Sequence, residues 1–169
     1  MEEIINKVEQ SGLITIDPGE LYLSGERVVL DIKDQLFMGQ ILKEKDFREF
    51  IKTNDWKKFE GKFVALTCSV DAIIPDWAWM LLASALQPFA KKIVFGNEEL
   101  LETVLFEEAL KNFDAEKFRD ARIVIKGCGD KPVPKTAYVE LTRLLQPVAK
   151  SIMYGEPCST VPVYKQPKK

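Results

Sequence analysis

Residues 86–96 read LQPFAKKIVFG, and residues 145–155 read LQPVAKSIMYG, 59 positions further along the chain. The same distance separates three residues upstream of the first copy from identical residues upstream of the second: Pro75, Ala78 and Leu82 from Pro134, Ala137 and Leu141. A repeat of this length indicates a fold built from two equivalent units. Each copy combines a helical pattern with β-prone runs, so we expect each unit to be strand–helix–strand.

Two nearly continuous apolar runs precede the repeated helices, at 63–68 and 123–126. Such runs are typical of strands buried on both faces of a parallel sheet. The strands after the helices are expected at 93–95 and 152–154, and a linking helix is expected to end near Asn112. Right-handed crossovers then predict an α/β fold with a doubly wound parallel four-stranded sheet of order 2-1-3-4, in which strands 1 and 3 are central neighbours.

The N-terminal part adds a short helix over Glu3–Gln10, a hairpin over Arg27–Leu42 and an amphipathic helix from Lys43 to Thr53. The stretch 155–164 contains prolines, which restrict it to irregular structure or an edge strand. We expect a single domain, 1–169, with three parts: an N-terminal hairpin and helix (1–55), the first repeat with the linking helix (56–112), and the second repeat with the C-terminal tail (113–169).

The composition is that of a soluble globular protein, with 46% hydrophobic and 30% charged residues. A net charge of −2 provides no basic field for nucleic acid, and no apolar run reaches the roughly 18–20 residues of a membrane span. The acidic start at Met1 lacks the positive region of a signal peptide, so the cytoplasm is the expected location. The chain has no histidine, which excludes Ser-His-Asp and Cys-His catalysis and histidine-bearing zinc sites.

Three cysteines, an odd number, argue against a full disulfide framework. Cys68 and Cys128 follow the equivalent strands, whose carboxyl ends would form the ligand-binding crevice of a doubly wound sheet. We therefore expect their thiols to face each other, with Cys158 folding back over the crevice. Together with Asp71 or Glu140, the nearest carboxylates in sequence along with Glu156, they would suit zinc or iron, and Asp31 is a further candidate if the hairpin packs there.

Other interpretations of the cysteines remain open. Cys68 follows an apolar strand and equally suits core packing. Cys128 lies between Gly127 and Gly129, and it would be the nucleophile of an enzyme if Lys126 and the next helix N-terminus stabilised its thiolate. A scaffold or dimerisation module without chemistry is the third class, and a homodimer is the commonest oligomer.

Four stretches resemble motifs of a bacterial family catalogued as domain of unknown function 2480: DIKDQLF (31–37), KEKDFR (43–48), KGC (126–128) and YGEPCSTVP (154–162). The resemblance runs from about residue 20 to the end of the chain. It implies no established reaction, but it implies a link to sulfur mobilisation and iron–sulfur cluster assembly through neighbouring genes. The expected function is therefore a thiolate-based metal-binding (zinc or iron) or sulfur-handling accessory protein, with iron–sulfur assembly proteins as partners.

Overall fold

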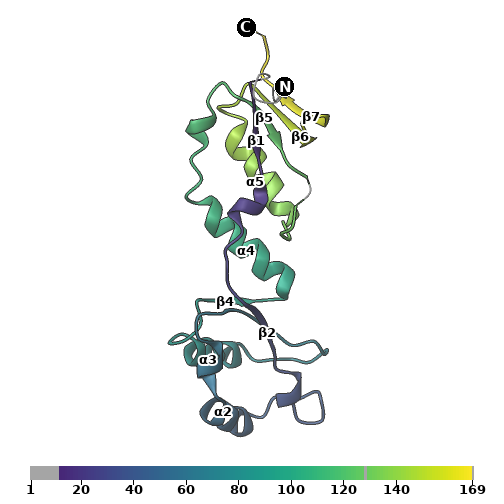
Figure 1. The fold of residues 1–169 in the computed structure, drawn as a ribbon. Helices are drawn as coiled ribbons and strands as arrows, with labels where there is room; N and C mark the ends of the chain where they lie inside the picture. Colours follow the sequence, from purple (N-terminus) through teal and green to yellow (C-terminus); the bar gives the residue numbers. More distant parts are fainter. Residues whose placement is uncertain (1–11, 128, 169) are drawn as a thin grey trace, which may run out of the picture. The chain divides into compact units, whose positions relative to one another are not determined.

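The computed structural model describes residues 12–127 and 129–168, and its elements fall into two compact units (Figure 1). We call Ser24–Val104 the inserted unit, and the described residues before and after it the terminal unit. The predicted helix Glu3–Gln10 lies outside the described residues. Within the described part of the chain, no helix is long and apolar enough to cross a membrane.

The inserted unit is built on a parallel sheet of order β2-β3-β4. Its strands are β2 (Arg27–Asp31), β3 (Phe63–Thr67) and β4 (Lys92–Phe95). Three helical segments connect β2 to β3: the short 3-10 helices η2 (Lys33–Gln35) and η3 (Trp56–Phe59), with α2 (Glu44–Thr53) between them. Helix α3 (Asp76–Leu86) connects β3 to β4, and α4 (Glu98–Leu110) follows β4.

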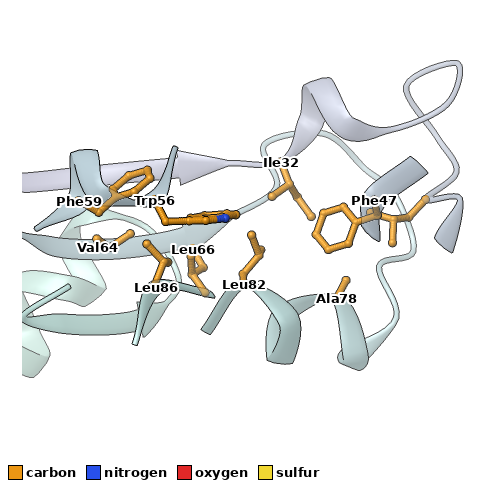
Figure 2. Close-up of a cluster of buried hydrophobic side chains, with 10 residues drawn as sticks. Ile32, Phe47, Trp56, Phe59, Val64, Leu66, Ala78, Leu82 and Leu86 are labelled. Atoms are coloured by element: carbon orange, nitrogen blue, oxygen red, sulfur yellow. The ribbon is translucent and has the colours of Figure 1, made fainter. Parts of the chain in front are cut away.

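The core of the inserted unit lies between its sheet and helices α2 and α3 (Figure 2). Strand β3 is buried from Phe63 to Leu66, as expected for a strand with neighbours on both edges. The indole N–H of Trp56 donates to the backbone carbonyl of Ile51 at 2.7 Å, which satisfies the polar atom of a largely buried ring. The apolar faces of the helices and the buried strand residues therefore pack into one core.

The terminal unit has a four-stranded sheet of order β1-β5-β6-β7. Its strands are β1 (Leu13–Ile16), β5 (Arg122–Ile125), β6 (Ser151–Glu156) and β7 (Ser159–Lys165). The first three are parallel, while β7 is antiparallel to β6 and ends the sheet, which confirms the predicted edge position of the proline-containing stretch. Its helices are η1 (Pro18–Leu21), η4 (Ala115–Phe118) and α5 (Lys135–Leu145).

Helices α3 and α5 occupy the matching copies of the repeated sequence. Each is preceded by a proline at the N-cap and followed by a glutamine at the C-cap. The same three positions are fully buried in each helix, Ala78, Leu82 and Leu86 in α3 and Ala137, Leu141 and Leu145 in α5. The shared flanking proline and glutamine and the shared apolar positions therefore accompany matching helix boundaries and matching buried faces.

The α/β class and the parallel pairing within each repeat are confirmed, but the predicted order 2-1-3-4 is wrong. That order requires β3 and β5 to be neighbours. Instead β3 pairs with β2 and β4, and β5 pairs with β1 and β6, so both edges of each central strand are already occupied. The first strand–helix–strand unit pairs with β2, which directly precedes it, and the second pairs with the N-terminal strand β1, so the strands form two sheets.

The predicted hairpin over Arg27–Leu42 is also wrong. Strand β2 joins the parallel sheet beside β3, and only Phe37 and Ile41 form an antiparallel bridge, at a tight turn with Met38 at φ 54°. Ile32 is fully buried in the core, which fixes the end of β2 against the sheet. Strand β3 is buried from Phe63 to Leu66, so pairing with it places β2 in a buried parallel sheet, which a local hairpin does not provide.

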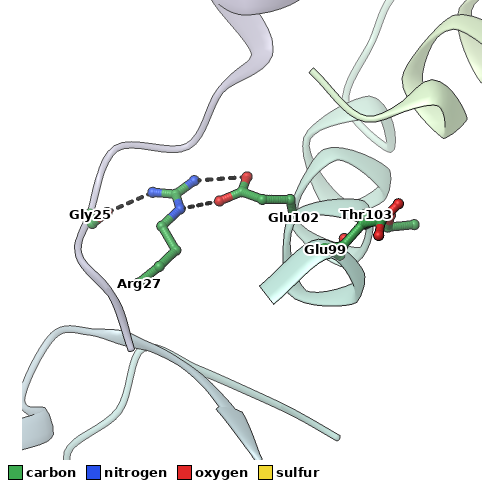
Figure 3. A network of polar contacts seen from close by, with 5 residues as sticks. All are labelled: Gly25, Arg27, Glu99, Glu102 and Thr103. Carbon is green, nitrogen blue, oxygen red and sulfur yellow. Dashed lines mark hydrogen bonds and ion pairs between the residues drawn. The ribbon is translucent and has the colours of Figure 1, made fainter. Parts of the chain in front are cut away.

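Arg27 and Glu102 form a nearly buried ion pair inside the inserted unit (Figure 3). The Arg27 guanidinium donates two hydrogen bonds to the Glu102 carboxylate on α4 and a third, at 2.6 Å, to the carbonyl of Gly25. The guanidinium also lies 5.0 Å from the centre of the Phe63 ring. These contacts attach the first turns of α4 to the start of β2.

Candidate functional site

In each unit an aspartate lies at the carboxyl end of the first strand, at the carboxyl edge of the sheet. Asp17 follows β1 and accepts a hydrogen bond from the N–H of Gly19 at 2.8 Å. Asp31 ends β2 and accepts from the N–H of Lys33 at 3.0 Å. A short 3-10 helix follows each aspartate. Strand β1 pairs in parallel with β5, and β2 pairs in parallel with β3. Each aspartate therefore lies beside the residues that follow the central strand of its sheet. In the sequence of both units, a cysteine follows that central strand.

Asp31 is held in its ionised form. Burial raises its pKa, but hydrogen bonds from the side chain and backbone of Ser69 and from the backbone of Lys33, with the positive charge of Lys33, hold the pKa below its ordinary value. The N–H of Ser69 donates at 3.1 Å. The carboxylate therefore ties the end of β2 to the residue after Cys68 and fixes the course of that loop.

The terminal unit has a cavity of about 190 Å³ at the carboxyl edge of β1 and β5. Its lining combines one carboxylate, two ammonium groups and a glycine-rich loop: Asp17, Pro18, Gly19, Lys126, Gly127, Gly129, Lys131, Val133 and Tyr138. The ammonium of Lys126 lies 3.5 Å from the Asp17 carboxylate, and both side chains are about one-third exposed (33% and 31%). The ammonium of Lys131 lies 5.1 Å from the ring centre of Tyr22.

The glycines of the cavity allow close approach of the backbone. A Cβ at Gly127 would lie 2.3 Å from the hydroxyl oxygen of Tyr154, which no real side chain permits. A Cβ at Gly129 would lie 3.7 Å from a carboxylate oxygen of Asp17. The loop therefore passes between a tyrosine and a carboxylate, and a larger residue at Gly127 would force the Tyr154 ring to move.

Sequence reasoning singled out Lys126 but missed Asp17, Lys131, Tyr138 and Tyr154 as neighbours of this loop. Asp17 stands in an Asp-Pro-Gly stretch that predicts only a turn. The ring of Tyr138 meets that of Tyr154 edge-on at 5.8 Å, a contact between α5 and β6. One pattern in the sequence could have identified Asp17 as a candidate: an aspartate follows an apolar run twice, at positions 17 and 31.

The predicted metal ligands divide between the two units. In the inserted unit, Cys68 is half-buried against the core, its thiol directed to the carbonyl of Val70 at 3.6 Å, and Asp71 is exposed. In the terminal unit, Cys158 is exposed in the two-residue turn between β6 and β7, and Glu140 pairs with Arg143 on α5 at 2.9 Å.

Cys128, the remaining predicted ligand and the predicted nucleophile, lies outside the described residues, although both of its neighbours line the cavity. Among residues 12–127 and 129–168, no three acidic or cysteine side chains are gathered closely enough to hold a metal ion. The cavity offers a different chemistry. Two ammonium groups beside a glycine loop at a sheet edge can stabilise an anion.

The sequence matches a family described as proteins of unknown function, DUF2480, over residues 2–166. The chain belongs to this family. No curated protein and no solved structure matches it. The description of the DUF2480 family names no reaction, so the residues at the carboxyl edges of the two sheets are what can indicate a function.

Proposed function

We propose that this DUF2480 protein is a sulfur-handling accessory protein of iron–sulfur cluster assembly, and that Cys128 is its reactive cysteine. The observation that carries the proposal is the cavity whose lining includes Gly127 and Gly129 together with Lys126 and Lys131. Cationic groups favour a thiolate over a thiol, and the thiolate is the reactive form of cysteine. The proposed setting is the cytoplasm, where thiols are kept reduced.

The proposed reaction is transfer of a sulfane sulfur from a persulfide donor, R–S–SH. The Cys128 thiolate attacks the outer sulfur atom, the donor's S–S bond breaks, and the donor leaves as the thiolate R–S⁻. The product is a Cys128 persulfide, so atoms and electrons balance without an added oxidant. Lys126 and Lys131 would stabilise the anionic thiolate before the step and the anionic leaving group after it. This chemistry needs no histidine base, which suits the composition.

A second candidate is a zinc or iron site that includes Cys128 and Cys158. Cys158 follows β6, and β6 is the direct neighbour of β5, the strand that precedes Cys128. Two cysteine thiolates, completed by a carboxylate such as that of Asp17 or by water, would suit either metal. Cys68 packs against the core of the inserted unit, so its role as a third ligand has less support than its role in packing.

Single-cysteine variants test the thiol. Cys68→Ser with Cys158→Ser leaves Cys128 alone, and Cys68→Ser with Cys128→Ser leaves the exposed Cys158 as the matched control. At pH about 6 we expect iodoacetamide to alkylate Cys128 at least about tenfold faster than Cys158, and Lys126→Ala to slow the reaction about threefold or more. Equal rates for the two cysteines would contradict an activated thiolate.

Persulfide transfer and metal content separate the two candidates. A persulfide donor should add one sulfur atom, detected by intact-protein mass spectrometry, to the variant that retains Cys128 and not to Cys128→Ser. Elemental analysis of anaerobically purified wild type, with thiols titrated before and after denaturation, tests the metal. About one equivalent of zinc or iron with protected thiols favours the metal site, and metal-free protein that accepts sulfur favours the proposed reaction.

A further inference from the structure

The terminal unit has a second, larger pocket, away from the carboxyl edge. Its volume is about 830 Å³, in the range that accommodates one small ligand. It is lined by residues from the starts of β5 and β6, the end of β7 and the chain that follows: Asp120, Arg122, Lys150, Ser151, Met153, Pro162, Tyr164, Lys165, Gln166, Pro167 and Lys168. These are the amino ends of the parallel strands, opposite the end where the cysteines follow.

The strand register explains how these side chains come together. Arg122 is opposite Ser151, and Ser151 is opposite Lys165, so three neighbouring strands present their terminal residues in one row. The adjacent residues Ile123 and Ile152 are fully buried in the core against α5. Because side chains alternate along a strand, the row faces away from that core. The backbone N–H of Gln166 donates to the carbonyl of Lys150 at 2.9 Å, which keeps the tail beside the pocket.

The pocket is strongly cationic although the chain carries a net charge of −2. Four cationic side chains line it, and Asp120 is the one carboxylate among its lining residues. Within the described residues, Lys150, Lys165 and Lys168 make no ion pair. Three adjacent ammonium groups without carboxylate partners repel one another, and a bound polyanion would relieve that repulsion.

Part of the remaining lining is apolar. Met153, Pro162 and Pro167 form surfaces without charge. Tyr164 borders the pocket but lies opposite the fully buried Ile152 and packs against the core. A simple anion such as phosphate would leave these surfaces in contact with water, whereas a ligand with a flat apolar group would cover them. The concave shape and the modest volume suit a small molecule better than a nucleic acid strand, which needs an extended basic surface.

We propose that this pocket binds a small ligand that carries at least two phosphate charges on a flat ring system, the chemistry of a nucleoside diphosphate. The phosphates are held by the cationic side chains of Arg122, Lys150, Lys165 and Lys168. Met153, Pro162 and Pro167 cover the ring system. The site is separate from the cavity beside Gly127 and Gly129, so it does not depend on the sulfur chemistry proposed there.

Isothermal titration calorimetry of the full chain with three probes tests the proposal: ADP, adenosine and pyrophosphate. Tryptophan fluorescence is unsuitable, since Trp56, Trp77 and Trp79 all lie in the inserted unit. We expect ADP to bind at least about tenfold more tightly than adenosine or pyrophosphate, because each fragment satisfies only half of the pocket. Affinity for ADP should fall as salt is raised, because the lysines are exposed.

The paired variant Lys150→Ala with Lys165→Ala should weaken ADP binding about tenfold or more. The matched control, Lys45→Ala with Lys52→Ala, removes the same charge from exposed positions of α2 and should leave binding unchanged. Circular dichroism melting shows that both variants are folded. No heat of binding for ADP at about 1 mM, or equal loss in the pocket variant and in the control, would overturn the proposal.

Discussion

Replacement of Glu102 by alanine provides the sharpest test of the packing of the inserted unit. The Arg27 and Glu102 side chains are only 8% and 12% exposed, and two hydrogen bonds join them. Truncation of Glu102 leaves a guanidinium that is nearly buried and has lost its counter-ion. Breaking such a pair costs about 3–5 kcal/mol. Arg27 keeps its hydrogen bond to Gly25 and its contact with the Phe63 ring, so we expect the lower end, about 3 kcal/mol.

Urea unfolding followed by tryptophan fluorescence measures this loss, because all three tryptophans lie in the inserted unit. Glu44→Ala is the matched control. It also removes a glutamate from an ion pair with an arginine, at 2.9 Å, but both side chains there are more than half exposed (57% for Arg48 and 62% for Glu44). Exposed pairs of this kind contribute at most about 0.5 kcal/mol, so the control should unfold almost like wild type.

A double replacement separates the buried charge from the lost contact. Arg27→Met with Glu102→Leu removes both charges and keeps most of the side-chain volume, so it should recover most of the stability lost by Glu102→Ala. If Glu102→Ala costs no more than Glu44→Ala, or if the double variant is less stable than Glu102→Ala, the reasoning from burial is refuted.

Three further predictions concern the core, a turn and the carboxylate of Asp31. Leu82→Ala should cost about 3 kcal/mol in the same fluorescence assay, since Leu82 is fully buried and its removal leaves a cavity; a loss below about 1 kcal/mol would contradict this. Gly155→Ala should lower the melting temperature measured by circular dichroism, because φ is 119° there and a Cβ would lie 2.6 Å from the carbonyl oxygen of Ser159; an unchanged temperature would contradict the strain. The lowered pKa of Asp31 stabilises the fold above its unfolded value of about 3.9, and this part is lost as the pH falls through the lowered folded value. In urea unfolding, Asp31→Ala should therefore be less stable than wild type at pH about 6 and should lose less stability between pH about 6 and about 2. The same pH dependence of the free energy of unfolding in the two proteins would contradict this.

The repeated segments were predictable because their signals are local. Pro75 and Pro134 mark the starts of α3 and α5, and the apolar spacing that follows identifies the face that each helix buries. The apolar runs at 63–68 and 123–126 likewise identified the central strands β3 and β5. None of these assignments requires knowledge of which distant segments meet.

The candidate site was predictable only in part. The glycines around position 128 and the nearby Lys126 stand out in the sequence, and both glycines line the cavity of the terminal unit. Asp17 and Lys131 could not be assigned to it, because each belongs to a stretch whose pattern predicts only a turn or a loop. Asp17 reaches the cavity because β1 pairs with β5, a pairing between residues more than a hundred positions apart, whereas Lys131 lies in the loop that follows β5.

The α/β class, helices α2 to α5, the central strands and the absence of histidine chemistry follow from the sequence alone. The pairing of β2 and β1 with the two central strands appears only in the folded protein, and it excludes the single sheet expected from the repeat. Helix boundaries depend on backbone sterics and capping within a few residues. The neighbour of a strand depends on which of several similar apolar strands buries the most surface beside it when the whole chain has folded. A local sequence pattern does not specify that pairing.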